Sequence, residues 1–509
     1  MTTAHRHLCL AAMLSFGAGA SLTTRAEASP LFETMGPVGS DGAMSPSAAG
    51  ASAASTYFNP ALLIDAEDSA LFGFAVLSEQ IALTLDGRKG GADVPLAVAG
   101  RDVLGGDGQP ISNATVPTQW LDQGCDEGTR KGQCSAPAFG ARPRQSRGSS
   151  GNTRAYLALG LVRELIHDRL KLGLYGLVPV SRLTTASTFY NDEREALFSN
   201  SLHPELYGDR LTAISLSAAA AFKLLDTFSV GVGVSLGLTN AASSATYIRD
   251  SSNYDSLLIN NQVGVTVAAS PQIGVSYKPF SGLRFGGALH APEAFVIDTT
   301  IGATLPSGAQ SGATKSEVHD FMPWRASFGV EADVVKQAHW GLGLAASAKY
   351  GFWSAYLDRH GASPSTYGTD LAWKDTITWA AGVRPKYGPA RGWIDMQYAP
   401  SPVPEQSARS NYVDNDRVGM AVGTDVTVEV GGARLRPGLS LVGYRLIRRH
   451  NTKIDARMVD ELPDGAIYAG SREPVPGAAG LQTNNPGWPG FASEGWVYGG
   501  TFTLDVLLK

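Results

Sequence analysis

Apolar and polar residues alternate along most of the chain with a period of two, and almost no segment carries a sustained helical period. Period-two alternation is typical of β-strands with one apolar and one polar face. We therefore predict an all-β protein with fourteen strands, an even number as in single-chain bacterial barrels. The predicted strands cover residues 70–86, 153–164, 169–181, 210–224, 227–248, 260–278, 282–298, 321–334, 338–357, 371–387, 391–400, 414–430, 433–450 and 495–508.

The connections between these strands alternate between long and short. The long ones are 87–152, 182–209, 249–259, 299–320, 358–370, 401–413 and 451–494, and the short ones fall near 165–168, 225–226, 279–281, 335–337, 388–390 and 431–432. Short periplasmic turns and long extracellular loops are typical of up-and-down membrane barrels, whereas a Greek-key sandwich gives no reason for such sorting. The pattern predicts an antiparallel transmembrane β-barrel over residues 68–509.

The two faces of the predicted strands differ in charge. Nine charged residues on five strands share the face that is rich in Gly, Ser, Ala and Thr: Lys223, Arg325, Glu331, Asp333, Lys349, Arg417, Asp425, Glu429 and Asp505. A charge on the lipid face near mid-membrane costs on the order of 2–4 kcal/mol, so a bilayer explains this segregation. A soluble sheet with a buried face would segregate equally well, but its polar face would carry more Lys and Glu.

Some charged residues depart from this division between faces, and some aromatic residues lie near the predicted ends of the strands. Three charges lie at outward parity near the long loops: Glu293, Asp375 and Arg445. Aromatic residues at the same levels predict interfacial belts, with a plain packing role as the alternative: Trp353, Tyr356, Trp373, Trp496 and Tyr498.

The N-terminus carries the features of a secretory signal peptide over residues 1–28. A short basic region with His5, Arg6 and His7 precedes an apolar run over 8–22, and Ala26-Glu27-Ala28 resembles a cleavage site. An ordinary N-terminal helix is the alternative. No later stretch reaches about 18 uninterrupted apolar residues, so we expect no transmembrane helix.

Residues 29–67 form a coil of small residues that ends near Asn59-Pro60-Ala61, just before the first strand. Gly, Ser and Ala allow a chain to fold compactly inside a lumen, so we predict an N-terminal plug, or hatch. A disordered linker has much the same composition. The net charge of −5, without a long basic run, indicates neither nucleic acid nor an anionic membrane surface as a partner.

Three cysteines occur, and Cys9 leaves with the signal peptide. Cys125 and Cys134 lie in the first long loop and predict one disulfide in an exported protein. No His lies near them, which disfavours a metal site.

No catalytic motif is found in the context that its chemistry needs: the sequence has no H-E-x-x-H, and no G-x-S-x-G or Gly-rich phosphate loop at a strand-to-helix turn. We therefore expect no enzyme, no cofactor and no metal. Two functions stay open for a barrel of this kind, namely that of an outer-membrane lipase and that of a surface adhesion or assembly protein that uses the barrel to anchor loops 87–152 and 451–494.

The chain resembles the FadL family of outer-membrane transporters for long-chain fatty acids and other hydrophobic compounds, which includes TodX-like channels for aromatic hydrocarbons. The matching residues are Asn59-Pro60-Ala61, residues 207–233, residues 271–279, Trp373-Lys374-Asp375-Thr376, Pro404 and Asp414-Asn415-Asp416-Arg417. The resemblance implies a fourteen-stranded barrel with a hatch in the outer membrane of a Gram-negative cell. It also implies passive uptake by surface capture, lumen entry and lateral exit at a kinked third strand. We expect a monomer surrounded by outer-membrane lipid.

The third predicted strand contains Gly173, Gly176 and Pro179, which predict a kink because Pro removes a ladder donor. A simple strand end at Pro179 is the alternative. The long first loop and the final Leu508-Lys509, in place of a terminal aromatic residue, depart from the family pattern.

Candidate ligand contacts follow from the need for an apolar path with a few polar groups. Four lumen-facing cations could pair with a fatty-acid carboxylate: Arg284, Arg325, Lys349 and Arg417. The alternative is a salt-bridge network with Glu331, Asp333, Asp425 and Glu429. Leu257, Leu258 and Ile259 are candidates for an outer capture groove, with strand-edge packing as the alternative.

Overall fold

The structure is a computed structural model, and it describes residues 30–86, 103–104, 145–148, 152–180, 211, 213–248, 257–304, 310–358, 361–367, 369–407, 410–454, 467–468, 470–474 and 490–508. The predicted signal peptide, Cys125, Cys134 and most of loops 87–152, 182–209 and 451–494 lie outside the described residues. The signal peptide and the disulfide therefore stay predictions.

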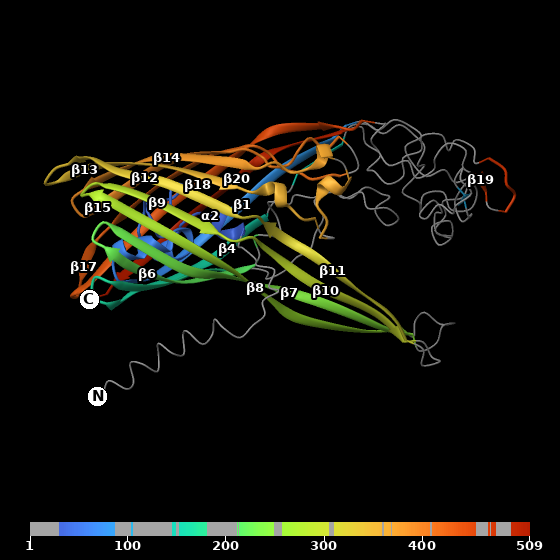
Figure 1. The fold of residues 1–509 in the computed structure, drawn as a ribbon, viewed down its shortest axis with the longest axis horizontal. Helices are drawn as coiled ribbons and strands as arrows, with labels where there is room; N and C mark the ends of the chain where they lie inside the picture. Colours follow the sequence, from blue (N-terminus) through green and yellow to red (C-terminus); the bar gives the residue numbers. More distant parts are fainter. Residues whose placement is uncertain are drawn as a thin grey trace.

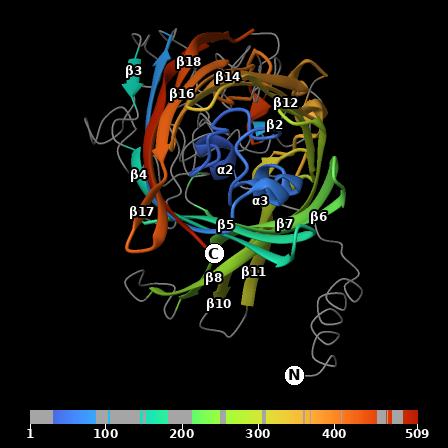
Figure 2. The same ribbon diagram turned by 90° about the vertical axis from the view of Figure 1, so that its left-hand side faces the viewer.

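Eighteen strands of the described residues form one sheet that closes on itself (Figures 1 and 2). They are β1 (Ser69–Leu85), β3 (Gln145–Gly148), β4 (Asn152–Ile166), β5 (Leu170–Pro179), β6 (Ile214–Leu225), β7 (Phe228–Ile248), β8 (Leu257–Phe280), β9 (Leu283–His290), β10 (Glu293–Thr304), β11 (Gln310–Met322), β12 (Arg325–Lys336), β13 (Trp340–Gly351), β14 (Thr376–Tyr387), β15 (Ala390–Ala399), β16 (Arg417–Val426), β17 (Val428–Val430), β18 (Ala433–Thr452) and β20 (Gly490–Leu507). A separate two-stranded sheet contains β2 (Val103–Leu104) and β19 (Ile467–Tyr468).

The sheet closes because β1 pairs antiparallel with β20 on one side and with β4 on the other. Interruptions divide some barrel strands, so that β3 and β4, β9 and β10, β11 and β12, and β16 and β17 each make one span. Counted in this way, the described residues form fourteen antiparallel spans, and the predicted barrel is confirmed.

Several predicted boundaries are wrong. The strand predicted at 282–298 is interrupted between β9 and β10 at Ala291-Pro292, where Pro offers no N–H to a ladder. The strands predicted at 338–357 and 371–387 are shorter, because residues 352–375 instead contain the 3₁₀ helices η6 (Trp353–Ala355), η7 (Pro364–Tyr367) and η8 (Thr369–Leu371).

The predicted loop 299–320 is largely a hairpin of β10 and β11. In Figure 1 this hairpin runs past the rest of the barrel beside β7 and β8, and β10 pairs parallel with β7 from Ile301 to Thr304. The predicted loop 249–259 is likewise shortened, since β8 already begins at Leu257.

The face assignment also has corrections. Trp496 faces outward with 48% of its surface exposed, as expected of a belt residue, but Trp353, Tyr356 and Trp373 are buried inside the loop end of the barrel. Glu293 is buried as well, because the interruption before β10 turns it inward. Arg445 does lie on the outer face, where it pairs with Glu494 and lies over the ring of Trp496, and Asp375 falls outside the strands, where it accepts from Ser354.

Residues 30–66, here called the inner segment, run inside the ring of strands (Figure 2). They contain α2 (Pro30–Met35), α3 (Ser55–Phe58) and the 3₁₀ helix η1 (Pro60–Asp65). Apolar side chains of this segment are fully buried against wall residues such as Tyr156, Tyr175 and Leu177. No helix among the described residues is long and apolar enough to cross a membrane.

Candidate functional site

The Asn59-Pro60-Ala61 turn fixes the inner segment against the barrel wall. The Asn59 amide nitrogen donates to the carbonyl oxygens of Ser47, at 2.6 Å, and Val275, at 3.1 Å. A Cβ at Gly274 would lie 2.1 Å from the Asn59 side-chain oxygen, and one at Gly231 would lie 2.4 Å from the backbone nitrogen of Ala61. The two wall glycines therefore allow a close approach that no other residue would permit.

Wall side chains hold other parts of the inner segment by single hydrogen bonds. Gln272 donates from Nε2 to the Thr56 carbonyl at 2.6 Å, and the Tyr175 hydroxyl accepts from the Val38 nitrogen at 3.1 Å. Asp395 accepts from the backbone nitrogen of Met44 at 2.8 Å. The segment is thus positioned by polar contacts along its length, in addition to apolar packing.

The turn side of the lumen contains a polar cavity of about 360 Å³ below the inner segment. Acidic and basic side chains line it in similar numbers: Asp41, Asp65, Glu67, Lys278, Arg284, Glu331, Asp333, Lys386, Arg391 and Arg436. Arg284 lies here, 2.8 Å from Glu331 and 3.3 Å from Asp65. Arg284 therefore forms salt bridges, which were expected from the sequence as the alternative to a ligand contact.

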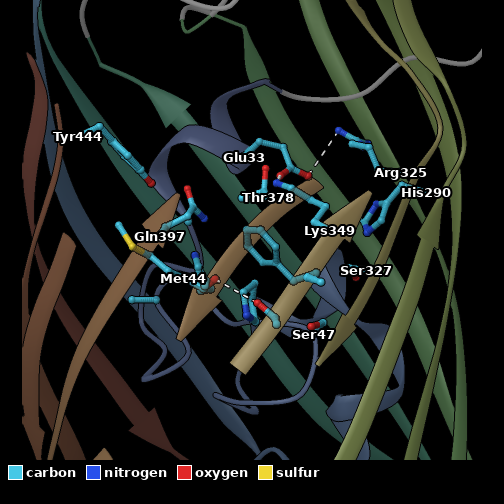
Figure 3. A pocket seen from close by; sticks show the side chains of 18 residues that line it. Glu33, Met44, Ser47, His290, Arg325, Ser327, Lys349, Thr378, Gln397 and Tyr444 are labelled. Carbon is cyan, nitrogen blue, oxygen red and sulfur yellow. Dashed lines mark hydrogen bonds and ion pairs between the residues drawn. The ribbon is translucent and has the colours of Figure 1, made fainter. Parts of the chain in front are cut away.

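Two smaller cavities, of about 50 and 60 Å³, lie on the loop side of this polar cavity (Figure 3 shows the first). Glu33, Arg325, Lys349 and Thr378 line both of them. Arg417 lines the second, so three of the four cations that the sequence singled out gather at one place.

Glu33 of α2 lies at the centre of this arrangement. Its carboxylate is 2.5 Å from Lys349 Nζ and 3.4 Å from an Arg325 nitrogen, and it accepts from the Tyr57 hydroxyl at 3.0 Å. Burial by itself would raise the pKa of Glu33, but the charges of Lys349 and Arg325 lower it by more, so the pKa lies well below its usual range. Glu33 is therefore ionised at neutral pH, and the sequence did not single it out because its partners lie about three hundred residues away.

Arg325 is the most deeply buried cation of the site, with 3% of its side chain exposed. Its second carboxylate neighbour is Glu293, at 3.7 Å. Within the described residues, none of its guanidinium nitrogens makes a hydrogen bond of normal geometry. A guanidinium offers five N–H donors, so this group retains donor capacity that faces the two cavities.

Arg417 and Asp414 also line the second of these cavities, here called the outer cavity. The Arg417 guanidinium lies over the ring of Tyr444, 5.6 Å from its centroid, and Asp414 accepts from the Ser401 hydroxyl at 2.5 Å. Asp414 precedes β16 in the loop, and burial raises its pKa to about 6.

An aromatic cluster covers the loop side of these cavities; we call it the aromatic cap. Its members are Phe321, Trp353, Tyr356, Trp373 and Tyr412. The rings of Tyr356 and Trp373 stack with centroids 3.6 Å apart, and Trp353 lines the outer cavity. The predicted belt residues Trp353, Tyr356 and Trp373 thus pack on one another rather than at the lipid headgroups.

The predicted gate residues lie in β5, which pairs with β4 and β6 from Leu170 to Leu177. Gly173 faces the inner segment, since a Cβ there would lie 2.2 Å from the Thr56 hydroxyl, and Pro179 ends the strand. The lateral gate stays a prediction. Leu257, Leu258 and Ile259 begin β8, and their side chains lie outside the described part of the chain, so the capture groove also stays a prediction.

Comparisons with known proteins complete this description. Residues 198–432 match the family of outer membrane protein transport proteins (OMPP1/FadL/TodX). A crystal structure of a Pseudomonas aeruginosa FadL homologue is similar in fold, with 14% identity, a TM-score of 0.50 and coverage of 94% of this chain and 97% of that chain. The toluene transporter TodX of P. putida has 12% identity, coverage of 95% and 99%, and a TM-score of 0.45. No curated protein sequence matches the chain. The chain is thus similar to the FadL/TodX family over residues 198–432, and its barrel has the fold of a FadL homologue.

Proposed function

We propose that this protein carries long-chain fatty acids passively across the outer membrane. The observation that supports this substrate best is the convergence of Arg325, Lys349 and Arg417 on the two cavities below the aromatic cap. Cations beside a buried space with apolar side chains in its lining suit a ligand with one carboxylate and a long apolar tail. A pure hydrocarbon would make no use of these charges.

The proposed route begins with capture of the ligand at the loop side and continues past the aromatic cap to the three cations. The inner segment blocks the lumen at this level and acts as a hatch in the proposal. Below it, the polar cavity with its dense charges is a poor environment for an apolar tail. Lateral exit through the wall at β5, near Gly173, Gly176 and Pro179, avoids that environment. No energy source is required, and the protein works as a monomer in outer-membrane lipid.

Uptake of aromatic hydrocarbons is a second candidate function, and one observation favours it. The aromatic cap offers stacked and edge-on rings, such as those of Tyr356 and Trp373, against which a small aromatic molecule can pack. Two structurally similar proteins, TodX of P. putida and TbuX of Ralstonia pickettii, are named as toluene transporters; TbuX has 12% identity, coverage of 95% and 99%, and a TM-score of 0.41.

Binding and uptake of radiolabelled oleate and toluene will separate the two candidates. The purified full chain is expected to bind oleate saturably, and cells that lack their own fatty-acid channel are expected to take up oleate only when they express this protein. An empty-vector strain and a strain with an unrelated barrel are the controls. Saturable toluene uptake without oleate binding would overturn the fatty-acid assignment and favour the hydrocarbon channel.

A further inference from the structure

We propose that Glu33 is a built-in substitute for the ligand carboxylate: it occupies the cation site while the lumen is closed, and an incoming carboxylate displaces it and frees the inner segment. This inference rests on the proposed function, because it assumes that the ligand carries a carboxylate. It adds a trigger to that function, since the group that closes the lumen and the group that opens it compete for the same cations.

The first support is the position of Glu33 relative to its partners. Glu33 belongs to α2 of the inner segment, whereas Lys349 belongs to β13 and Arg325 to β12 of the wall. Figure 3 shows the Glu33 side chain reaching from the inner segment toward both cations. The ion pairs therefore join the segment that would have to move to the wall that stays in place.

The second support is the balance of charge. Among the described residues that line the two cavities, three are cations, Arg325, Lys349 and Arg417, and two are carboxylates, Glu33 and Asp414. A third carboxylate, Glu293, lies 3.7 Å from Arg325. Withdrawal of Glu33 would leave Arg325 and Lys349 with less compensation at a buried site, which is strongly unfavourable. A ligand carboxylate that arrives at the same time removes this penalty, so opening is coupled to a carboxylate and not to an apolar tail alone.

The third support is the unused donor capacity of Arg325. Its contacts to Glu33 and Glu293, at 3.4 and 3.7 Å, are longer than typical hydrogen bonds. The Tyr57 hydroxyl is a further neighbour, but among the described residues the buried nitrogens of Arg325 make no hydrogen bond of normal geometry. A free carboxylate is not tied to a helix and can take a bidentate position on a guanidinium. The ligand can therefore bind this cation with better geometry than Glu33 does.

The fourth support is the lack of room while the inner segment is in place. Cavities of about 50 and 60 Å³ hold at most a few water molecules, not an alkyl chain. Pro37, Ala43, Met44 and Phe58 of the inner segment line the first cavity. An apolar tail thus gains space only when these side chains leave, which the loss of the Glu33 contact would permit.

The main test is the affinity of the purified full chain for oleate after Glu33→Gln, which keeps the shape and removes the charge. We expect about tenfold tighter oleate binding, because the closed form loses its internal competitor and a larger fraction of the protein is competent to bind. Binding of oleyl alcohol, which has the same tail without a charge, is expected to change much less. Glu67→Gln is the matched control, since Glu67 pairs with Arg434 and Arg436 on the turn side.

A second measurement uses chemical rescue. Glu33→Ala is expected to lower the unfolding temperature, and millimolar octanoate should restore it, whereas octanol should not. In the wild-type protein, octanoate should have a smaller effect on the unfolding temperature, because Glu33 already fills the site. If Glu33 had only a structural role, octanoate would not restore the unfolding temperature of Glu33→Ala.

The outcomes separate this inference from the function on which it rests. If Glu33→Gln binds oleate no more tightly than the wild type, and the wild type does bind oleate, the trigger is wrong and the fatty-acid function stands. If neither protein binds oleate, the proposed function fails first. Should Glu33→Gln not fold, Glu33→Asp keeps the charge with a shorter reach; we expect a smaller gain in oleate affinity, and an unchanged affinity would overturn the trigger.

Discussion

The two ends of the lumen use charge in different ways. On the turn side, cations and carboxylates of the wall pair with one another in bidentate geometry: Arg384 lies 2.5 and 3.1 Å from the Asp395 oxygens, and Arg391 lies 2.8 and 2.6 Å from those of Asp425. On the loop side, the contacts of the buried Arg325 to carboxylates of the described residues are long, at 3.4 and 3.7 Å. Saturated pairs hold a structure together, whereas a cation with unused donors is available to a ligand.

The largest expected effect concerns the paired charges on the turn side of the lumen. Asp395→Asn breaks the pair with Arg384 and leaves a buried guanidinium without its carboxylate, so we expect a loss of about 3–5 kcal/mol in the free energy of unfolding. Urea unfolding in detergent micelles, followed by tryptophan fluorescence, measures this loss. Asparagine keeps a side-chain oxygen that can accept from the Met44 nitrogen of the inner segment, so the oleate affinity of the folded fraction should stay near the wild-type value. A large loss of oleate affinity without a loss in the free energy of unfolding would contradict the proposed difference between the turn side and the loop side.

The next largest effect concerns Arg325 on the loop side of the lumen. Arg325→Gln removes the charge that the proposed ligand carboxylate would meet, and a hydrogen bond to a charged group is worth about 2 kcal/mol. We therefore expect oleate to bind about 30-fold more weakly, with little change in the binding of oleyl alcohol. Isothermal titration with both ligands provides the measurement, and Arg284→Gln, at the turn side, is the matched control. Equal losses in the two variants would contradict a special role for Arg325.

The smallest effect concerns pH and Asp414, beside Arg417 in the outer cavity. Because burial raises its pKa to about 6 in the folded protein, the folded state holds its proton more tightly than the unfolded state does. The resulting stability is fully present below the ordinary pKa of Asp and is lost as the pH rises through 6. We expect a decrease of about 1 kcal/mol between pH 5 and 7. Asp414→Asn should remove this decrease in stability. An unchanged pH profile in that variant would show that another group causes the decrease.

The sequence predicted the barrel because every strand repeats the same local rule. Outward positions such as Phe328 and Trp496 are apolar and inward positions such as Arg325 are polar, so the period of two is visible without any knowledge of contacts. The strand boundaries at Ala291-Pro292 and after Gly351 were missed, because alternation continues past the point where the ladder ends. Trp353, Tyr356 and Trp373 were misplaced for a related reason, since periodicity cannot distinguish a belt from a buried aromatic cluster.

The sequence by itself determined which residues face the lumen, and with that the identity of the candidate cations Arg325, Lys349 and Arg417. Only the tertiary structure decided that these three lie together and that Arg284 lies apart from them, because the curvature of the closed sheet and the pairing of its strands set those distances. It also decided that Glu33 meets Lys349 across about three hundred residues of chain. A contact of that kind has no local signature, since it depends on how the inner segment packs against the wall around it.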